Sequence, residues 1–346
     1  MRISPRWFKI WRFTALIVFA GSAVAQAGKE TMKAIVVHEY GGPDLLKYED
    51  APVPEPKENE ILVRVIASGV NPADPLIILG KYAKEFGTHL PLIPGYDVAG
   101  VVVKSGAKIT KLKIGDPVYA YVLWGGGWAD YVLATEGEAA PKPKSLTYID
   151  AAAVPLAALT AWQALVNTAQ LSAGQTVLIH GGSGGVGSFA VQLAKVRGAK
   201  VIATASTANQ DLLKELGTDV AIDYTKTKFE DVVKQVDVVL DTVGGDTLAR
   251  SYPIIKKGGM VTSLRSRPDQ VELDKYGIRG APMAVRPNAS QLTMIGQLID
   301  EKKIRVIVSQ VLPLADAAKA ARQAETHHTR GKIVLKIRDE ATSKTE

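Results

Sequence analysis

The 346-residue sequence predicts an α/β fold of two domains, a doubly wound parallel sheet preceded by a β-rich, barrel-like domain. Two observations support this prediction. Residues 32–143 hold short apolar runs separated by glycine and proline, which is typical of an antiparallel β domain. From residue 149 to about residue 259, Val/Ile/Leu runs alternate with helical patterns, as the buried strands and crossover helices of a parallel sheet do.

Residues 1–25 have the composition of an export signal. A positively charged region comes first, residues 13–20 are apolar, and residues 23–25 have the A-x-A pattern of a cleavage site. The apolar run is too short for a comfortable membrane span. We therefore expect a signal peptide, a linker at residues 26–31 and an exported (periplasmic or secreted) protein. An uncleaved anchor is one alternative, and a translation start at Met32, which leaves the protein cytoplasmic, is the other.

Residues 32–155 are expected to form the β-rich domain. Polar or glycine-containing turns, at residues 57–60 and 115–117, separate its apolar runs. Branched and aromatic residues dominate these runs, which favours strands over helices. The runs are residues 33–40, 60–70, 98–106, 116–122 and 128–134.

Residues 176–195 carry the most specific local pattern. An apolar run enters a glycine cluster that opens directly into a helical pattern, and a second apolar run follows at residues 200–205. This order is typical of the βαβ unit that begins a dinucleotide-binding sheet. It predicts a dinucleotide-binding domain over residues 156–299. A final apolar strand at residues 331–337 is expected to return to the first domain, which residues 300–340 would complete.

Three glycines in this segment have the G-x-G-x-x-G spacing. Gly182 would permit a tight turn, Gly184 the close approach of a pyrophosphate, and Gly187 the packing of helix on strand. The free amides of the helix N-terminus would then hold the phosphates. The expected cofactor contacts are Gly182, Ser183, Gly184, Gly185, Val186 and Gly187.

The composition excludes several classes of function. A hydrophobic content of 47% is that of a folded protein with substantial cores, and the net charge of +7 is spread along the chain, so we expect no nucleic-acid partner. The sequence has no cysteine, which excludes disulfides, thiolate zinc sites and a cysteine nucleophile. His327 and His328 have no third ligand beside them and are interpreted as a solvated loop, so we expect no metal.

Seven segments are informative in combination, namely residues 67–75, 91–102, 113–120, 159–165, 180–187, 241–245 and 331–337. Together they resemble the medium-chain dehydrogenase/reductase superfamily, specifically its zinc-free branch of quinone oxidoreductases and alkenal/enone reductases. The resemblance runs from Met32 to Ile337 and implies a GroES-like barrel domain beside a Rossmann-type sheet. Zinc alcohol dehydrogenases of this superfamily have a cysteine at the position of Asn71 and a histidine at that of Tyr96, so the resemblance implies chemistry without zinc.

Without a metal, hydrogen-bond donors must stabilise the charge on a carbonyl oxygen as hydride arrives from a nicotinamide. Asn71 is the first candidate for a polar group near the nicotinamide or the carbonyl, and a turn residue before Pro72 is its alternative role. Asp74 is expected to support that turn or a neighbouring polar group. The resemblance implies that Tyr82 lies at the mouth of the active site, where its hydroxyl could bind or protonate an enolate; packing alone is the alternative. Leu76 stands where some relatives have another tyrosine.

The second strand of the nucleotide domain ends without the acidic residue that NAD enzymes present to the ribose. This absence leaves room for a 2′-phosphate, and the resemblance implies Ser206, Asn209 and Tyr224 as its donors. The basic residue that relatives often carry here is replaced by Ala208 and Gln210. We therefore expect NADPH as the cofactor, on the absence of repulsion more than on the presence of attraction.

The resemblance also implies that Thr160, Val243 and Ser263 flank the nicotinamide, although packing alone could account for each of them. The expected function is zinc-independent transfer of hydride from NADPH to a quinone or an α,β-unsaturated carbonyl, by a monomer or a homodimer. One alternative is a non-catalytic NADP(H)-binding sensor or interaction module. Another is a zinc-free alcohol or polyketide-type enoyl reductase.

Overall fold

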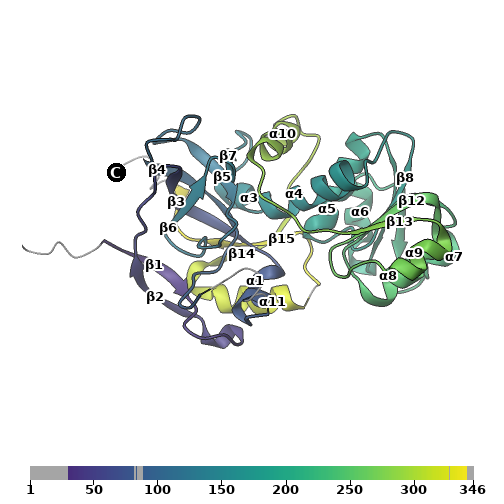
Figure 1. Cartoon of the computed structure of the whole chain (residues 1–346), viewed down its shortest axis with the longest axis horizontal. Helices are drawn as coiled ribbons and strands as arrows, with labels where there is room; N and C mark the ends of the chain where they lie inside the picture. Colours follow the sequence, from purple (N-terminus) through teal and green to yellow (C-terminus); the bar gives the residue numbers. More distant parts are fainter. Residues whose placement is uncertain (1–29, 82, 84–88, 327, 341–346) are drawn as a thin grey trace, which may run out of the picture.

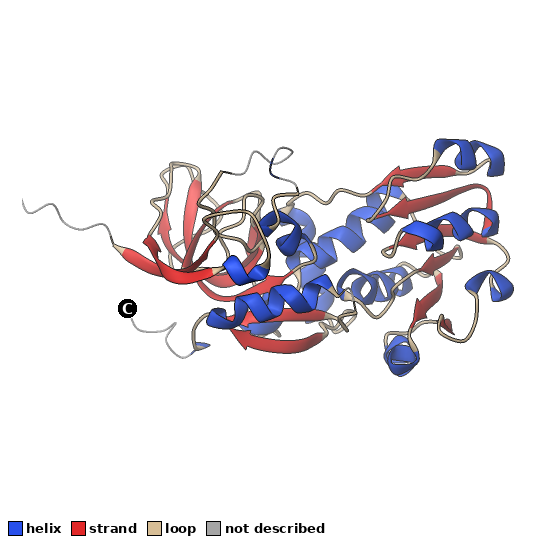
Figure 2. Cartoon of the chain, turned by 90° about the horizontal axis from the view of Figure 1, so that it is seen from below, coloured by secondary structure: helices blue, strands red, loops and turns tan. Residues whose placement is uncertain are grey.

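The computed structural model describes residues 30–81, 83, 89–326 and 328–340, and it has two lobes side by side along its long axis (Figure 1, Figure 2). The predicted α/β class is confirmed. One lobe holds a parallel six-stranded sheet, and the other holds a mostly antiparallel seven-stranded sheet with a separate β1-β2 pair. The predictions made for residues 1–25, Tyr82 and His327 lie outside the described residues.

The parallel sheet has the strand order β10-β9-β8-β11-β12-β13. Successive strands are added outward from β8 on one side and from β11 on the other, so the strand order reverses between β8 and β11. This is the order of a doubly wound dinucleotide-binding sheet, whose ligands bind at that reversal. Its strands are β8 Thr176–Ile179, β9 Lys200–Ala205, β10 Val220–Asp223, β11 Val236–Asp241, β12 Ile255–Ser263 and β13 Arg279–Pro282. The helical segments between them are α5 Gly185–Val196, η3 Thr207–Asn209, α6 Gln210–Glu215, α7 Phe229–Val232, α8 Gly245–Ser251, η4 Tyr252–Ile254 and α9 Gln270–Tyr276.

Alternate residues of strand β8 enter different cores. Val177 and Ile179 pack in the cluster that contains residues of α5 and α6, whereas Leu178 packs with residues of α7, α8 and α9. Successive side chains of a strand point to opposite faces of the sheet. The apolar run of β8 is therefore continuous because helices cover both of its faces (Figure 1).

The barrel lobe follows the order β14-β15-β3-β4-β5-β7, with β6 paired to β3. The last strand, β15, lies between β14 in parallel and β3 in antiparallel register, so the C-terminal part of the chain returns to this lobe. The strands are β1 Thr31–Val36, β2 Lys47–Pro52, β3 Glu60–Val70, β4 Asp97–Ser105, β5 Pro117–Tyr121, β6 Tyr131–Thr135, β7 Ala139–Pro141, β14 Val308–Pro313 and β15 Lys332–Lys336.

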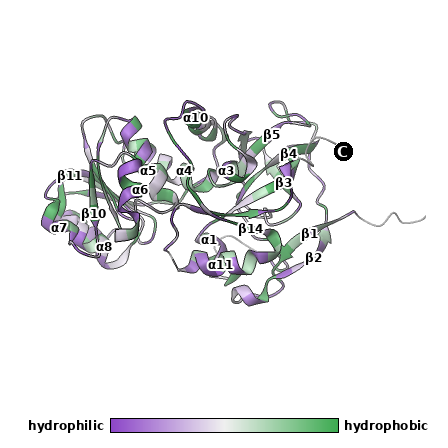
Figure 3. Cartoon of the chain, turned by 180° about the vertical axis from the view of Figure 1, so that it is seen from behind, coloured by the Kyte–Doolittle hydropathy of each residue, from purple (hydrophilic) through white to green (hydrophobic). Residues whose placement is uncertain are grey.

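Helices join the two lobes and cover the barrel. Between the sheets, α4 packs against α5, and its residues Ala157 and Leu159 belong to a core cluster that includes Phe189 of α5. Helix α11 buries alanines at i, i+3, i+4 and i+7 and is hydrophilic on its other side (Figure 3). These elements are η1 Pro43–Leu45, α1 Ala73–Ile78, α3 Tyr148–Ala152, α4 Pro155–Trp162, a π-helix (η2) Gln163–Thr168, α10 Ala289–Asp300, η5 Leu314–Asp316 and α11 Ala317–Glu325.

Helix length and composition also bear on membrane insertion. Across the described part of the chain, every helix is too short or too polar to span a bilayer.

Candidate active site

The glycine loop connects β8 to α5 at the point where the sheet order reverses. Gly187 allows this connection, because a Cβ atom there would lie 2.1 Å from the carbonyl oxygen of Gly181. Gly182 lies in the tight turn, but the positive φ of that turn, +70°, belongs to Gly181. Gly182 is needed for packing, since a Cβ there would lie 2.8 Å from Ala203 Cβ and 2.9 Å from Leu213 Cδ2.

Gly184, directly before α5, is loosely surrounded. The nearest atom to a Cβ built on Gly184 is the Gly181 carbonyl oxygen at 3.4 Å, and Gly184 provides no side-chain cap for the helix. The first amides of a helix have no intrahelical acceptor, so those of Gly185, Val186 and Gly187 are suited to an anion. Ser183 is buried, and its carbonyl oxygen accepts a hydrogen bond of 2.8 Å from the Gly331 amide at the start of β15.

His180, at the start of the loop, is buried and neutral. Its ring nitrogens lie 3.0 Å from Ser251 Oγ and 3.3 Å from Thr204 Oγ1, and the ring is edge-to-face with Phe229. Burial lowers the pKa of His180 from 6.5 to about 4.

The pKa of His180 predicts an acid-sensitive fold. Between pH 6.5 and 4 the unfolded chain binds a proton that the native ring does not, so stability is lost as the pH falls through this window. We expect His180 to account for about 3 kcal/mol of this loss. The free energy of unfolding is measured with urea from pH 7 to 4. Over this range it should fall by about 3 kcal/mol less in His180→Gln than in the wild type. Equal slopes in the two proteins would contradict the prediction, and His38→Gln, at an exposed histidine, serves as the control.

Asn71 directly follows β3 and is held in a buried polar cluster of three side chains, Asn71, Asp97 and Lys332. Its Nδ2 donates to Asp97 Oδ2 at 3.0 Å, and its Oδ1 accepts from Lys332 Nζ. Lys332 Nζ also lies 3.1 Å from Asp97 Oδ2 and donates to the Val70 carbonyl oxygen at 2.9 Å. The other oxygen of Asp97 accepts from the Leu156 amide at 2.7 Å, in the first turn of α4.

Asp74 supports the turn that carries Asn71, as expected from the sequence. Its carboxyl oxygens accept from the Asn71 amide at 2.6 Å and from the Gly95 amide at 3.2 Å. These two bonds and the nearby Lys332 favour the ionised form, but complete burial outweighs them and raises the pKa of Asp74 to about 7.

Tyr96 and Tyr121 form an aromatic pair beside these carboxyl groups. Their rings are edge-to-face, with centroids 6.4 Å apart. Burial raises the pKa of both hydroxyls, and the charge of Asp74 contributes to both shifts. The two phenols therefore stay protonated around neutral pH and can act as hydrogen-bond donors.

The loops after β9 and β10 meet because the two strands run in parallel, with Ala205 opposite Asp223. Asp223 is a carboxylate that the sequence analysis did not consider. It accepts from the Thr207 hydroxyl at 2.6 Å, from the Thr225 hydroxyl at 2.7 Å and from the Thr225 amide at 3.0 Å. These bonds, that of Thr207 first, lower the pKa of Asp223 to about 2.

The predicted donors of the adenosine end lie in these two loops. Asn209 Nδ2 donates to Ser206 Oγ at 3.2 Å, and the Tyr224 amide donates to the Ala205 carbonyl oxygen at 3.2 Å. A cation is also present here, since Lys226 Nζ lies 3.5 Å from Asp223 Oδ2 on a side chain that is 66% exposed. The sequence analysis found no basic residue at this place because Lys226 follows the next strand.

The residues expected to flank the nicotinamide differ in what they expose. Thr160 is buried and donates its hydroxyl to the Leu156 carbonyl oxygen at 2.7 Å within α4. Ser263 is also buried, and its hydroxyl donates to Asp241 Oδ2 at 2.7 Å. Val243 is 51% exposed. Thr160 and Ser263 thus have internal partners for their hydroxyl groups, and of the three residues Val243 alone exposes much of its surface.

Comparisons with known proteins agree with this architecture. Residues 57–144 match the family model described as alcohol dehydrogenase GroES-like domain, and residues 216–335 match the one described as zinc-binding dehydrogenase. The chain is 40% identical to an NADPH-dependent alkenal/one oxidoreductase of Arabidopsis thaliana, over 96% of this chain and 87% of that protein. It is 39% identical to a 2-methylene-furan-3-one reductase of Solanum lycopersicum, over 92% and 84% of the two chains.

The chain belongs to the medium-chain dehydrogenase/reductase superfamily. A solved quinone oxidoreductase from Coxiella burnetii superposes on this medium-chain reductase with a TM-score of 0.83 at 35% identity, covering 89% of this chain and all of the other. The chain is accordingly an oxidoreductase with a nicotinamide-binding fold, in the branch of quinone oxidoreductases and alkenal/one reductases.

Two charged residues of this medium-chain reductase escaped the sequence analysis. Asp97 and Lys332 lie inside segments that were used for the resemblance, but neither was given a role. The signal available was a charge within a continuous apolar run, since Lys332 stands in GKIVL and Asp97 directly before VAGVVV. Charged residues are almost never fully buried unless paired, so two charges in buried strands predict a partner for each.

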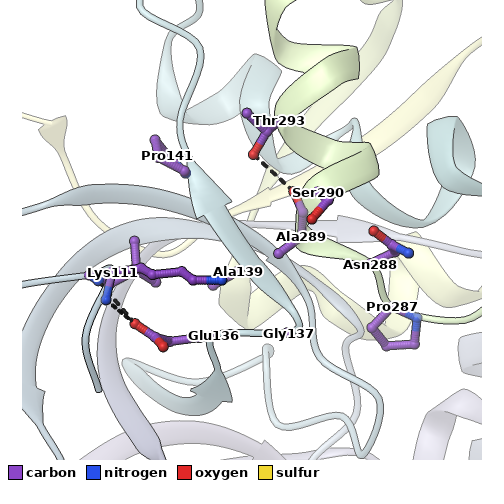
Figure 4. A pocket seen from close by; sticks show the side chains of 11 residues that line it. Lys111, Glu136, Gly137, Ala139, Pro141, Pro287, Asn288, Ala289, Ser290 and Thr293 are labelled. Carbon is purple, nitrogen blue, oxygen red and sulfur yellow. Dashed lines mark hydrogen bonds between the residues drawn. The ribbon is translucent and has the colours of Figure 1, made fainter. Parts of the chain in front are cut away.

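Metal ligands are not grouped in the described part of the reductase, where no set of three or more His, Cys, Asp or Glu side chains could hold an ion. An open pocket of about 410 Å³ lies apart from the polar cluster and the glycine loop, where the barrel meets the start of α10 (Figure 4). Its Glu136 carboxylate is already engaged, accepting from the Thr110 amide at 2.9 Å. Its Asn288 caps α10 by accepting from the Gln291 amide at 2.9 Å. We assign this pocket no role in the chemistry.

Proposed function

We propose that the protein transfers hydride from NADPH to a quinone or an α,β-unsaturated carbonyl, without zinc. The observation that carries the proposal is the meeting of the glycine loop with the buried cluster of Asn71, Asp97 and Lys332, in a chain without cysteine. The activities of the Arabidopsis and Coxiella relatives support this choice of acceptor.

The residues present fit a dinucleotide. No protein atom lies closer than 3.4 Å to a Cβ built on Gly184, so a ligand could approach the backbone closely there, and helix amides without an intrahelical acceptor suit the charge of a pyrophosphate. When bound, the cofactor supplies a hydride for an electron-poor carbon. The protein must then stabilise the negative charge that develops on the acceptor oxygen. Asn71 has a second Nδ2 hydrogen for this purpose, the Tyr96 hydroxyl is a further donor, and the conjugation of a quinone or enone spreads the charge.

The decisive experiment follows NADPH absorbance with the purified full-length chain. A small quinone, a 2-alkenal and a cyclic enone are offered separately, with and without a metal chelator. We expect oxidation that resists the chelator, with the fastest acceptor defining the substrate class. Loss of activity with chelator would contradict zinc-free chemistry. NADPH binding without turnover of any acceptor would favour the sensor or interaction module instead.

The preference for NADPH is supported by the loops after β9 and β10. Ser206, Asn209 and Tyr224 can donate hydrogen bonds there, and Lys226 adds a positive charge. Asp223, whose negative charge opposes a phosphate, is engaged by Thr207 and Thr225. We therefore propose that a 2′-phosphate binds between these loops, attracted by Lys226. Michaelis constants for NADH at or below those for NADPH would contradict the preference.

The role of Lys226 gives a direct prediction. Lys226→Gln removes a charge-assisted contact to the phosphate, which is worth about 1.5 to 3 kcal/mol. We expect the KM for NADPH to rise about 10-fold or more while the KM for NADH stays unchanged. Lys228→Gln, two residues along the same loop, is the matched control and should leave both constants unaltered. An equal change in the two constants would show that Lys226 does not recognise the phosphate.

We also propose that the protein is exported, on the charge pattern and A-x-A site of residues 1–25. An exported reductase needs a supply of reduced cofactor, so the location bears directly on the function. N-terminal sequencing of the native protein decides between the proposals. A first residue near position 26 supports export, and a first residue at Met32 supports a cytoplasmic protein.

A further inference from the structure

Lys332 is a buried lysine with a complete set of hydrogen-bond partners. Its side chain is 5% exposed, and that of Asp97 is fully buried. An ammonium group has three hydrogens. Lys332 Nζ has three acceptors, namely the Val70 carbonyl oxygen at 2.9 Å, Asp97 Oδ2 at 3.1 Å and Asn71 Oδ1. A side chain with this many partners in the core is held in one position.

The partners of Asn71 fix which way its amide group points. A lysine ammonium can only donate, and an ionised carboxylate can only accept. Because Lys332 contacts one end of the amide and Asp97 the other, the oxygen must face Lys332 and the nitrogen must face Asp97. The reversed amide would set a donor against a donor and an acceptor against an acceptor.

Lys332 also contacts the nucleotide domain. A Cβ built on Gly185, in the first turn of α5, would lie 3.0 Å from Lys332 Cδ. The preceding residue, Gly331, donates its amide to the Ser183 carbonyl oxygen at 2.8 Å and pairs with Gly184. The lysine stem therefore lies over the start of the helix that is expected to hold the phosphates, and its charged end lies on Asn71.

We infer that Lys332 is a positioning residue that holds the Asn71 amide with its nitrogen as the donor and in fixed register with the glycine loop. The inference rests on the proposed function, since the free Nδ2 hydrogen of Asn71 is the group that meets the nicotinamide or the acceptor oxygen. Lys332 itself has all of its hydrogens engaged and acts only through Asn71.

The test begins with Lys332→Met, which keeps the length of the stem and removes the charge. We expect kcat to fall about 100-fold, the effect of losing one oriented donor, while the KM for NADPH changes less than about 3-fold. The deuterium isotope effect with labelled NADPH should increase, because hydride transfer becomes slower relative to the other steps. Lys332→Arg restores a donor and should recover part of kcat. Lys336→Met is the matched control, since Lys336 stands on the same strand but is exposed.

A double variant separates positioning from stability. In Lys332→Met with Asp97→Asn both buried charges are gone, so the fold should recover most of the stability lost in Lys332→Met. The oxygen of residue 97 is still needed by the Leu156 amide, so its new amide nitrogen faces Asn71 and turns the Asn71 amide around. We therefore expect thermal stability to return but kcat to stay low. A kcat that recovers together with stability would overturn the inference and leave Lys332 a purely structural role.

A binding measurement keeps this test independent of turnover. The fluorescence of bound NADPH reports the surroundings of the nicotinamide in the wild type and in each variant. We expect the emission to change in Lys332→Met and in the double variant but not in Lys336→Met. If the wild type binds NADPH but reduces no acceptor, the proposed function fails, and this spectrum still decides on positioning. An unchanged emission spectrum in both Lys332 variants would refute the positioning role of Lys332.

Discussion

Gly187→Ala is expected to abolish cofactor binding. The new Cβ would lie 2.1 Å from the Gly181 carbonyl oxygen and 2.7 Å from Gly182 Cα, and both of these are backbone atoms that cannot rotate away. The helix must move off the strand or the turn must open, and either change displaces the amides that would hold the phosphates. We expect the Kd for NADPH, measured by fluorescence titration, to rise more than 100-fold, or about 3 kcal/mol.

Two other glycines provide controls for this substitution. A Cβ at Gly184 has no protein atom closer than 3.4 Å, so Gly184→Ala should fold normally and weaken NADPH binding only by intruding on the pyrophosphate. Gly42 lies in the barrel lobe, and a Cβ built there has no neighbouring atom within 4 Å. Gly42→Ala should therefore change neither folding nor NADPH binding. Tight NADPH binding by Gly187→Ala would show that the glycine loop is not the cofactor site.

Asp97→Ala is expected to have the largest effect on stability. The substitution leaves the Lys332 ammonium buried without its counter-charge and leaves the Leu156 amide without its acceptor. Removing one partner of a buried ion pair costs about 3 to 5 kcal/mol. The free energy of unfolding, from urea titration monitored by tryptophan fluorescence, should fall by this amount, and reductase activity should be lost with the orientation of Asn71.

An exposed carboxylate gives the comparison for Asp97. Asp50 pairs with Lys33 at 3.0 Å, but its side chain is 60% exposed. Such pairs contribute about 1 kcal/mol or less to stability, so Asp50→Ala should have a free energy of unfolding close to that of the wild type. A loss of less than 1 kcal/mol in Asp97→Ala would mean that water or another residue replaces the carboxylate, and the buried cluster would not stabilise the fold as described.

Local patterns explain why much of the fold could be predicted from the sequence. The glycine spacing and the apolar runs around it depend on residues within one βαβ unit, so the sheet that they belong to was predictable. The sequence did not predict which glycine takes the positive φ. Gly181 and Gly182 differ in what packs against them, and the neighbours of Gly182, Ala203 and Leu213, come from the next strand and helix.

The candidate site was predictable only in part for a related reason. Asn71 was recognised as the polar residue after a strand, but its partner Lys332 is 261 positions away, and Asp97 and Lys332 are 235 positions apart. No local spacing encodes such a pair. Lys226 was missed in the same way, since only the parallel register of β9 and β10 brings its loop beside the loop after β9.

The pairing of β15 with β3 has a consequence for how the molecule is made. The end of β3, residues 67–70, leaves the ribosome without its partner β15, and Lys332–Lys336 are translated more than 250 residues later. The dinucleotide domain lies wholly in between and has all six of its strands before then. The nascent chain therefore completes its second domain first, while the end of β3 has an unpaired edge that must be shielded from aggregation. The buried cluster around Asn71 is complete only after Lys332 has been made, so a chain that stops before β15 could not hold Asn71 in this position.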